Sequence, residues 1–288
     1  MLSTPMNRGR LAGAVTALFG CVAGSAAGQD LLAGNGPLSS MPAAHETGAD
    51  LIWAVPEGAS AGVSAYSTLE YRLAERVEVS ASTIESVVVY GYQQGAIAGP
   101  TIDFLGVELW AGQPGQPGST RVAGDISANA LSSAEFADAY VALHGVSFTT
   151  DRPVYALTAG DLDWSVQAGE YWLVWSMGGS LDGGPYSPYL GDETAPAAGS
   201  ALQRVLGSWR QARNRTEGGL QVSLPFEVYG STACVADCDG DGALTIFDFL
   251  CFQNAYSEGE ASADCDGDGS VTAADFNCFQ ASFMAGCG

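Results

Sequence analysis

Short apolar or alternating runs recur through the central part of the chain, each bounded by Gly, Pro, Asn, Asp or Ser. Such runs are typical of β-strands. We predict strands at 51–55, 76–79, 87–92, 107–110, 140–143, 171–175 and 221–228. In 171–175 both faces are apolar, which indicates a strand buried on both sides. A weak helical period appears at 132–138. The pattern favours a mainly β fold, an antiparallel jelly-roll-type β-sandwich over 29–230.

Helical periodicity is clear near the C-terminus, where one aromatic pattern occurs twice. The members of each copy stand at offsets 0, 3 and 7, which places them on one stripe of a helix. The copies are Phe249, Phe252 and Tyr256, then Phe276, Phe279 and Phe283. We predict two short helices whose stripes pack against each other.

A twelve-residue loop with alternating aspartates precedes each predicted helix. Calcium takes six to eight oxygen ligands, and alternate carboxylates on a tightly turned loop converge on one point. We therefore predict two calcium ions, with a backbone carbonyl at position 7, a threonine hydroxyl or a water at position 9, and Asp at position 12 where the usual loop has Glu. Positions 1, 3, 5, 7, 9 and 12 are Asp237, Asp239, Asp241, Ala243, Thr245 and Asp248, and then Asp264, Asp266, Asp268, Ser270, Thr272 and Asp275.

This duplicated unit, at 231–288, resembles a type I dockerin with EF-hand-like loops. It is most similar to the variant ending in Gly-Cys, here Gly286 and Cys287, that serves as a C-terminal anchoring module in planctomycete-type bacteria. The resemblance implies protein binding to a cohesin-like or other surface attachment protein.

In that family, partner specificity lies at loop positions 10 and 11, which here are Ile246, Phe247, Ala273 and Ala274. The apolar Ile-Phe pair departs from the small polar residues of many family members, which favours a receptor other than a standard cohesin. A second interpretation is that Phe247 packs inside the module.

Residues 1–28 have the features of a bacterial signal peptide. Arg8 and Arg10 precede an apolar run at 11–23, which small residues follow. The run is too short to span a bilayer, and no other segment approaches the length of about twenty apolar residues that a span needs. We predict a secreted, extracellular or cell-surface bacterial protein. A competing interpretation is a lipoprotein anchored through Cys21.

Six of the seven cysteines lie at 234–287. An even number in a small exported module predicts disulfides. The sequence does not select among the possible pairings, although the position of Cys234 and Cys287 at the two ends suggests that they are linked. A zinc cluster is disfavoured, because no C-x-x-C pair occurs and the neighbouring residues are hard carboxylates.

The net charge is −22, the chain has no lysine, and no basic residue follows residue 230. Ten carboxylates at 231–288 repel one another without a cation, so calcium should be coupled to folding there. A chain this acidic is not suited to nucleic acid or to an anionic membrane surface. Arg210, Arg213 and Arg215 form the one local basic cluster, which we interpret as a solvated turn.

We assign ligand binding to the sandwich. Trp164, Tyr186, Tyr189 and Trp209 lie in or beside polar, glycine-rich segments, where an exposed ring stacks on the apolar face of a sugar. Core packing is the alternative. The segments 113–119, 168–175 and 225–230 are similar in style to non-catalytic β-sandwich domains of exported bacterial proteins.

No catalytic residue is assigned. Histidine occurs only at His45 and His144, and Ser60 has the G-x-S-x-G string without the strand and helix that this motif requires. Dockerin-bearing chains are often polysaccharide hydrolases, and this association keeps a hydrolase open as an alternative; a purely structural surface component is another. Five carboxylates are possible members of a glycosidase pair, although acidic side chains in surface loops are the simpler interpretation. These carboxylates are Asp161, Asp163, Glu170, Asp182 and Asp192.

Overall fold

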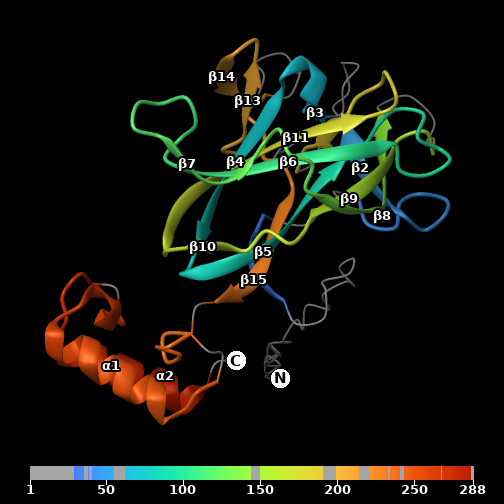
Figure 1. Ribbon diagram of the computed structural model, residues 1–288. Coiled ribbons are helices and arrows are strands. Elements are labelled where there is room, and N and C mark those ends of the chain that lie inside the picture. The colour runs from blue at the N-terminus through green and yellow to red at the C-terminus, as the bar shows by residue number, and fades with distance from the viewer. Residues whose placement is uncertain are drawn as a thin grey trace, which may run out of the picture.

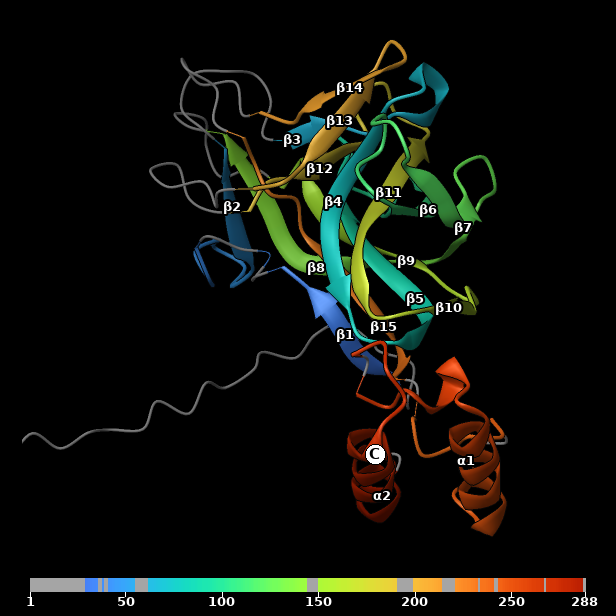
Figure 2. The same cartoon turned by 90° about the vertical axis from the view of Figure 1, so that its left-hand side faces the viewer.

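The structure, a computed structural model, combines a mainly β region with two C-terminal helices (Figures 1 and 2). It describes residues 29–35, 38, 41–54, 62–143, 150–190, 199–213, 221–232, 234–240, 243–266 and 268–286. The predicted signal peptide at 1–28, including Cys21, lies outside this part. Within the described residues, no helix is long and apolar enough to cross a membrane.

Two sheets form the β region, and the larger has seven strands within the described residues. Its order is β1 (Asp30–Gly34), β15 (Phe226–Thr232), β5 (Ser82–Gly91), β9 (Pro153–Ala159), β8 (Leu131–Leu143) and β2 (Asp50–Ala54), with β10 (Trp164–Val166) also paired to β5. β2 pairs with β8 in parallel, so this sheet is mixed and the expectation of a fully antiparallel sandwich is wrong at this edge.

The second sheet has six strands in the described part of the chain. Their order is β14 (Ser208–Gln211), β13 (Leu202–Val205), β4 (Arg72–Val79), β11 (Gly169–Gly179), β6 (Ile102–Ala111) and β7 (Thr120–Asp125). A short pair, β3 (Gly62–Ser64) with β12 (Tyr186–Pro188), and a 3-10 turn, η1 (Ser67–Leu69), complete the region.

The main core lies between the two sheets. Val89 and Leu157 from the first sheet and Leu109 and Trp175 from the second belong to one buried cluster. This arrangement confirms a mainly β, sandwich-like fold; the jelly-roll connection stays a prediction.

Strand β11 confirms the prediction from its double-sided apolar pattern. Leu173 and Trp175 face the main core, whereas Trp172 and Val174 pack on the opposite face of the sheet with Leu202 and other apolar residues. The sheet therefore carries a second, smaller apolar cluster on its outer side.

The weak helical period at 132–138 is a wrong prediction, because these residues belong to β8. Pairing with β9, from Leu131 opposite Ala159 to Phe136 opposite Tyr155, outweighs the modest helical preference of this segment. Asp138 lies in the register break between the paired residues Phe136 and Tyr140 and has φ +50°, which a regular helix does not accommodate.

Glu75 of β4 holds the segments that precede β13 and β15 in place. Its buried carboxylate accepts hydrogen bonds from the Ser200 hydroxyl at 2.6 Å, the Ser223 hydroxyl at 3.0 Å and the Leu224 amide at 2.6 Å. Burial raises the pKa of Glu75, and these three donors partly offset that shift. The network joins β4 to the segments that flank β13 and β15.

The two predicted helices form as α1 (Ile246–Glu258) and α2 (Ala273–Ala285), with the 3-10 turn η2 (Ala261–Ala263) between them. Their aromatic stripes pack together as predicted: the rings of Phe252 and Phe279 are stacked with centroids 4.0 Å apart. We call residues 234–286 the paired-loop module.

Candidate metal loops and ligand hollows

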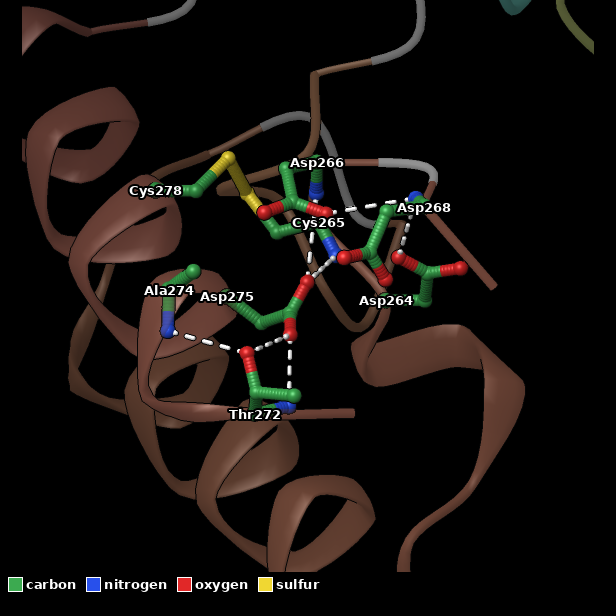
Figure 3. The surroundings of a disulfide bond; sticks show 8 residues. All are labelled: Asp264, Cys265, Asp266, Asp268, Thr272, Ala274, Asp275 and Cys278. Carbon is green, nitrogen blue, oxygen red and sulfur yellow. Dashed lines mark hydrogen bonds between the residues drawn. A yellow bond between two sulfur atoms is a disulfide. The ribbon is translucent and has the colours of Figure 1, made fainter. Parts of the chain in front are cut away.

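Carboxylates converge in both loops of the paired-loop module. Oxygens of Asp237, Asp239 and Asp248 lie within 4.8 Å of one another in the first loop, and those of Asp264, Asp266 and Asp268 do so in the second. The predicted ligand Asp241 lies outside the described residues. Figure 3 shows the carboxylates of the second loop close to Asp275.

The aspartate at position 12 is the buried centre of each loop. Asp275 has no exposed surface and accepts backbone amide hydrogen bonds from Cys265 at 2.8 Å, Asp266 at 3.2 Å and Thr272 at 2.6 Å (Figure 3). These bonds, led by that from Thr272, hold the pKa of Asp275 below its ordinary value. The carboxylate therefore stays ionised where it folds the loop back onto the helix.

Asp248 occupies the equivalent position in the first loop. It is equally buried and accepts from the Thr245 amide at 2.7 Å and the Asp239 amide at 3.4 Å. Its pKa is also lowered, chiefly by the Thr245 hydrogen bond. Both copies thus bring position 12 to the same backbone groups.

The threonines at position 9 act as helix N-caps. The Thr245 hydroxyl accepts from the Phe247 amide at 3.1 Å, and that of Thr272 accepts from the Ala274 amide at 3.2 Å. With the aspartate three residues later, each forms a complete capping box. The prediction for position 9 was a hydroxyl or a water on the ion and did not include this cap, although the Thr-x-x-Asp spacing before each helix is its signature.

The residues at position 7, Ala243 and Ser270, lie in the loops between the carboxylates and the helix starts. The Ser270 amide donates to Asp268 at 2.8 Å, which turns the chain around that carboxylate. Coordination by their carbonyl oxygens stays a prediction.

Disulfides form within each copy, as Cys238–Cys251 and Cys265–Cys278. Each links loop position 2 to the helix residue three positions beyond the position-12 aspartate. The bond therefore brings the first ligand positions close to the last one. Cys234 is also disulfide-bonded, whereas Cys287, its suggested partner, lies outside the described residues. The predicted disulfides fit an oxidising compartment.

An apolar patch covers the start of α1. The exposed fractions are 63% for Ile246, 66% for Phe247 and 46% for Leu250. The interpretation that Phe247 packs inside the module is therefore wrong. Leu250, one turn after Ile246, was missed by the sequence analysis, although its spacing of four residues places it on the same helix face. Ala273 and Ala274 are exposed at the equivalent place on α2.

Two of the four aromatic residues predicted to bind ligand are buried. Trp164 is 9% exposed and Tyr189 is 5% exposed, and both belong to the main core. Their rings have no free face to offer, which corrects their assignment. The polar residues that flank Trp164 did not reveal its burial, because neighbours on a strand such as β10 point to opposite faces.

Tyr186 and Trp209 are half-buried and line two separate hollows on either side of strand β14. The first, of about 400 Å³, is lined by Gly62, Val63, Ser64, Tyr71, Tyr186, Gln203, Arg210, Gln211 and Arg213. The second, of about 520 Å³, is lined by Gln113, Gly115, Gln116, Leu202, Gly207, Ser208, Trp209, Arg210 and Gln211.

Gln113, Gly115 and Gln116, between β6 and β7, form one wall of the second hollow. A Cβ atom at Gly115, whose φ is +85°, would lie 2.6 Å from the indole Cδ1 of Trp209. Glycine is therefore required both by the backbone and by the contact with the ring.

Of the candidates for catalysis, His45 is engaged within the fold, and Glu170 and Asp182 lie toward opposite ends of one strand. His45 is buried, stacks on Tyr140 with centroids 4.6 Å apart, and shares a hydrogen bond with Thr47. Glu170 pairs with Arg76 at 3.0 Å near the start of β11, and Asp182 follows the other end of that strand. An extended strand of this length separates them by about 30 Å, far beyond a glycosidase carboxylate pair.

Asp161 and Asp163 lie between β9 and β10, both with positive φ. Ser60, His144 and Asp192 lie outside the described residues.

Comparison with known proteins adds no relative: no protein-family model matches the chain, and no curated protein matches its sequence.

Proposed function

We propose that this is an exported bacterial attachment protein with two functional regions. A dockerin-like module at 231–288 binds two calcium ions and docks on a partner protein. The non-catalytic β-sandwich binds a carbohydrate or other ligand. One observation carries the proposal: three carboxylates lie within 4.8 Å of one another in each loop of a module whose sequence contains no basic residue.

The charge of the module supports a cation in each loop. Several carboxylates held this close repel one another strongly, and the sequence supplies no lysine, arginine or histidine after residue 230 to balance them. Oxygen ligands at alternate loop positions suit calcium, which accepts many ligands in a flexible arrangement. Bound calcium would supply the missing positive charge.

In the folded module, the capping boxes and disulfides would hold each loop in the geometry that calcium needs, so folding and calcium binding favour the same structure. Backbone amides already hold Asp248 and Asp275 at the helix starts, and the disulfides hold the first ligand positions near them. Preorganisation of this kind strengthens binding, because less conformational entropy is lost when the ion enters.

For docking, we assign the apolar patch of Ile246, Phe247 and Leu250 to a partner protein with an apolar recess. Exposed apolar residues that cluster on one helix face are typical of such contacts. The ten carboxylates of the module outnumber the positive charges of two calcium ions, so the module stays negative and favours a recess rimmed by lysine or arginine.

Calorimetric titration of the purified protein tests the metal assignment. We expect two calcium ions per chain, and one after Asp237→Asn. Glu260→Gln is the matched control, because it removes a carboxylate of the same module outside the ligand set. The proposal would be contradicted if the protein bound no calcium at millimolar concentration. It would also be contradicted if Glu260→Gln lowered the calcium stoichiometry as much as Asp237→Asn does.

A further inference from the structure

We infer that the first hollow, between β14 and the β3–β12 pair, binds an acidic polysaccharide. The inference rests on the proposed glycan-binding role of the sandwich and specifies its substrate class. The sugar would carry carboxylate or sulfate groups, the anions that an arginine fork recognises.

The guanidinium of Arg210 carries the argument. Five arginines of the described part lie 3.0 to 3.9 Å from a carboxylate: Arg72, Arg76, Arg121, Arg152 and Arg204. Arg210 differs, because among the described residues its hydrogen-bond partner is the neutral Gln203 oxygen, at 3.3 Å. Pairing with a neutral group is notable for an arginine in a chain with 32 acidic residues and ten arginines.

Strand pairing directs this charge into the hollow. Arg210 stands opposite Gln203 across the β13–β14 hairpin, so the two side chains share one face of the sheet. Gln203 in turn donates to the Ser64 carbonyl of β3 at 2.8 Å, which closes the hollow on that side. β14 is an edge strand of its sheet, so a long polysaccharide has access along it.

Charge in the lining matches an anionic ligand. Arg213 joins Arg210 there, and no aspartate or glutamate is among the described lining residues. The Arg213 side chain donates to Gln211, which orients both groups along the rim. These two guanidinium groups bring positive charge to one hollow of a strongly negative protein.

The remaining lining residues suit a sugar. The rings of Tyr71 and Tyr186 offer apolar faces with polar ends, and the carboxamides of Gln203 and Gln211 match hydroxyl groups. Tyr186 is held from behind by Tyr92, with ring centroids 5.5 Å apart. The volume of about 400 Å³ is in the range of pockets that enclose small ligands.

Matched pairs of polysaccharides test the inference with the full protein in calcium. Polygalacturonate is compared with its methyl ester, and dextran sulfate with dextran, so that only the charge changes and the carboxylate and sulfate sources are separated. We expect binding to at least one charged member and at least ten-fold weaker binding to its neutral counterpart. Rising salt should weaken the charged complex.

Arg210→Gln should weaken binding to the charged glycan about ten-fold, the usual order for a lost charge-assisted contact. Arg210→Lys should recover only part of it, since lysine lacks the planar fork. Arg76→Gln is the control, because it removes the same charge from the same sheet. An unchanged thermal midpoint in each variant excludes a folding effect.

The outcomes separate the two proposals. Equal binding of charged and neutral glycans, or an Arg210→Gln protein that binds like the wild type, overturns the acidic-glycan inference and leaves glycan binding intact. Capture of polyglutamate in preference to every glycan overturns it in favour of an acidic peptide. Binding of no glycan refutes both this inference and the glycan role of the sandwich, without affecting the calcium assignment.

Discussion

The two loop-helix units of the paired-loop module are alike inside and different outside. Each has a position-12 aspartate with no exposed surface, a threonine capping box and a disulfide that closes the same 13-residue separation. Their exposed helix starts differ, because Ile246, Phe247 and Leu250 correspond to Ala273, Ala274 and Asn277.

This contrast separates folding from recognition. The shared features all act on loop geometry, so either copy is suited to hold an ion. At the helix starts, the large exposed apolar side chains occur on α1 and not on α2, so a partner that needs this patch has one way to dock. Changes to the interior should thus affect the two copies equally, and changes to the surface should not.

The largest expected effect comes from removing calcium from both copies together. At free calcium about 1,000 times the dissociation constant, each ion stabilises the folded module by about 4 kcal/mol. Chelation should therefore abolish most of the helical circular dichroism of α1 and α2, while amide protons of the sandwich stay protected from exchange. A helical signal that is indifferent to chelator would contradict the coupling.

Next in size is the loss of a single ion. Asp248→Asn and Asp275→Asn should each reduce the calcium stoichiometry from two to one. They should also lower the thermal midpoint equally, because both residues are buried and have equivalent backbone partners. Calorimetry and thermal melts in calcium measure this. Strongly unequal losses in the two variants would show that the two loops are not equivalent.

Removal of one disulfide should be smaller again. Replacing both Cys238 and Cys251 by alanine frees a loop of about 14 residues, which the chain-entropy estimate sets at about 3 kcal/mol, and the Cys265–Cys278 pair should match it. Denaturant unfolding in saturating calcium gives the values. Calcium affinity measured on the same variants should fall only in the loop that lost its bond.

The smallest effect on stability is expected at the surface, where the copies differ most. Ile246→Ala with Phe247→Ala should change the free energy of unfolding by less than about 0.5 kcal/mol, because both side chains are exposed. Partner affinity should fall at least ten-fold, as is usual at a central apolar contact. Asn277→Ala on α2 is the matched control, and an equal loss there would show that both faces dock.

Local patterns predicted the paired-loop module better than the sandwich. The loop spacing and the aromatic stripes involve residues close in sequence, so they were sufficient to place α1, α2 and the converging carboxylates. The disulfide pairing depended on which side of each helix faces its loop, and the sequence alone left it open.

In the sandwich, long-range pairing decided what the sequence left open. The parallel match of β2 with β8 joins segments nearly 90 residues apart, and pairing with β9 made a strand of 132–138. The burial of Trp164 follows from its place opposite Ile84 on β5, which no neighbour in sequence reveals. The proposed role of Arg210 likewise depends on the pairing of β13 with β14, which places it beside Gln203 in the hollow.

Strand β15 connects the two parts of the molecule in a manner that bears on mechanical strength. It lies between β1 and β5, antiparallel to both, and the chain passes from its last residue, Thr232, almost directly into Cys234 of the paired-loop module. Tension on the module therefore pulls along a strand whose hydrogen bonds lie across the pull on both sides. These bonds must shear together, instead of opening one by one as they would on a peeled edge, so a tethered sandwich should withstand drag well.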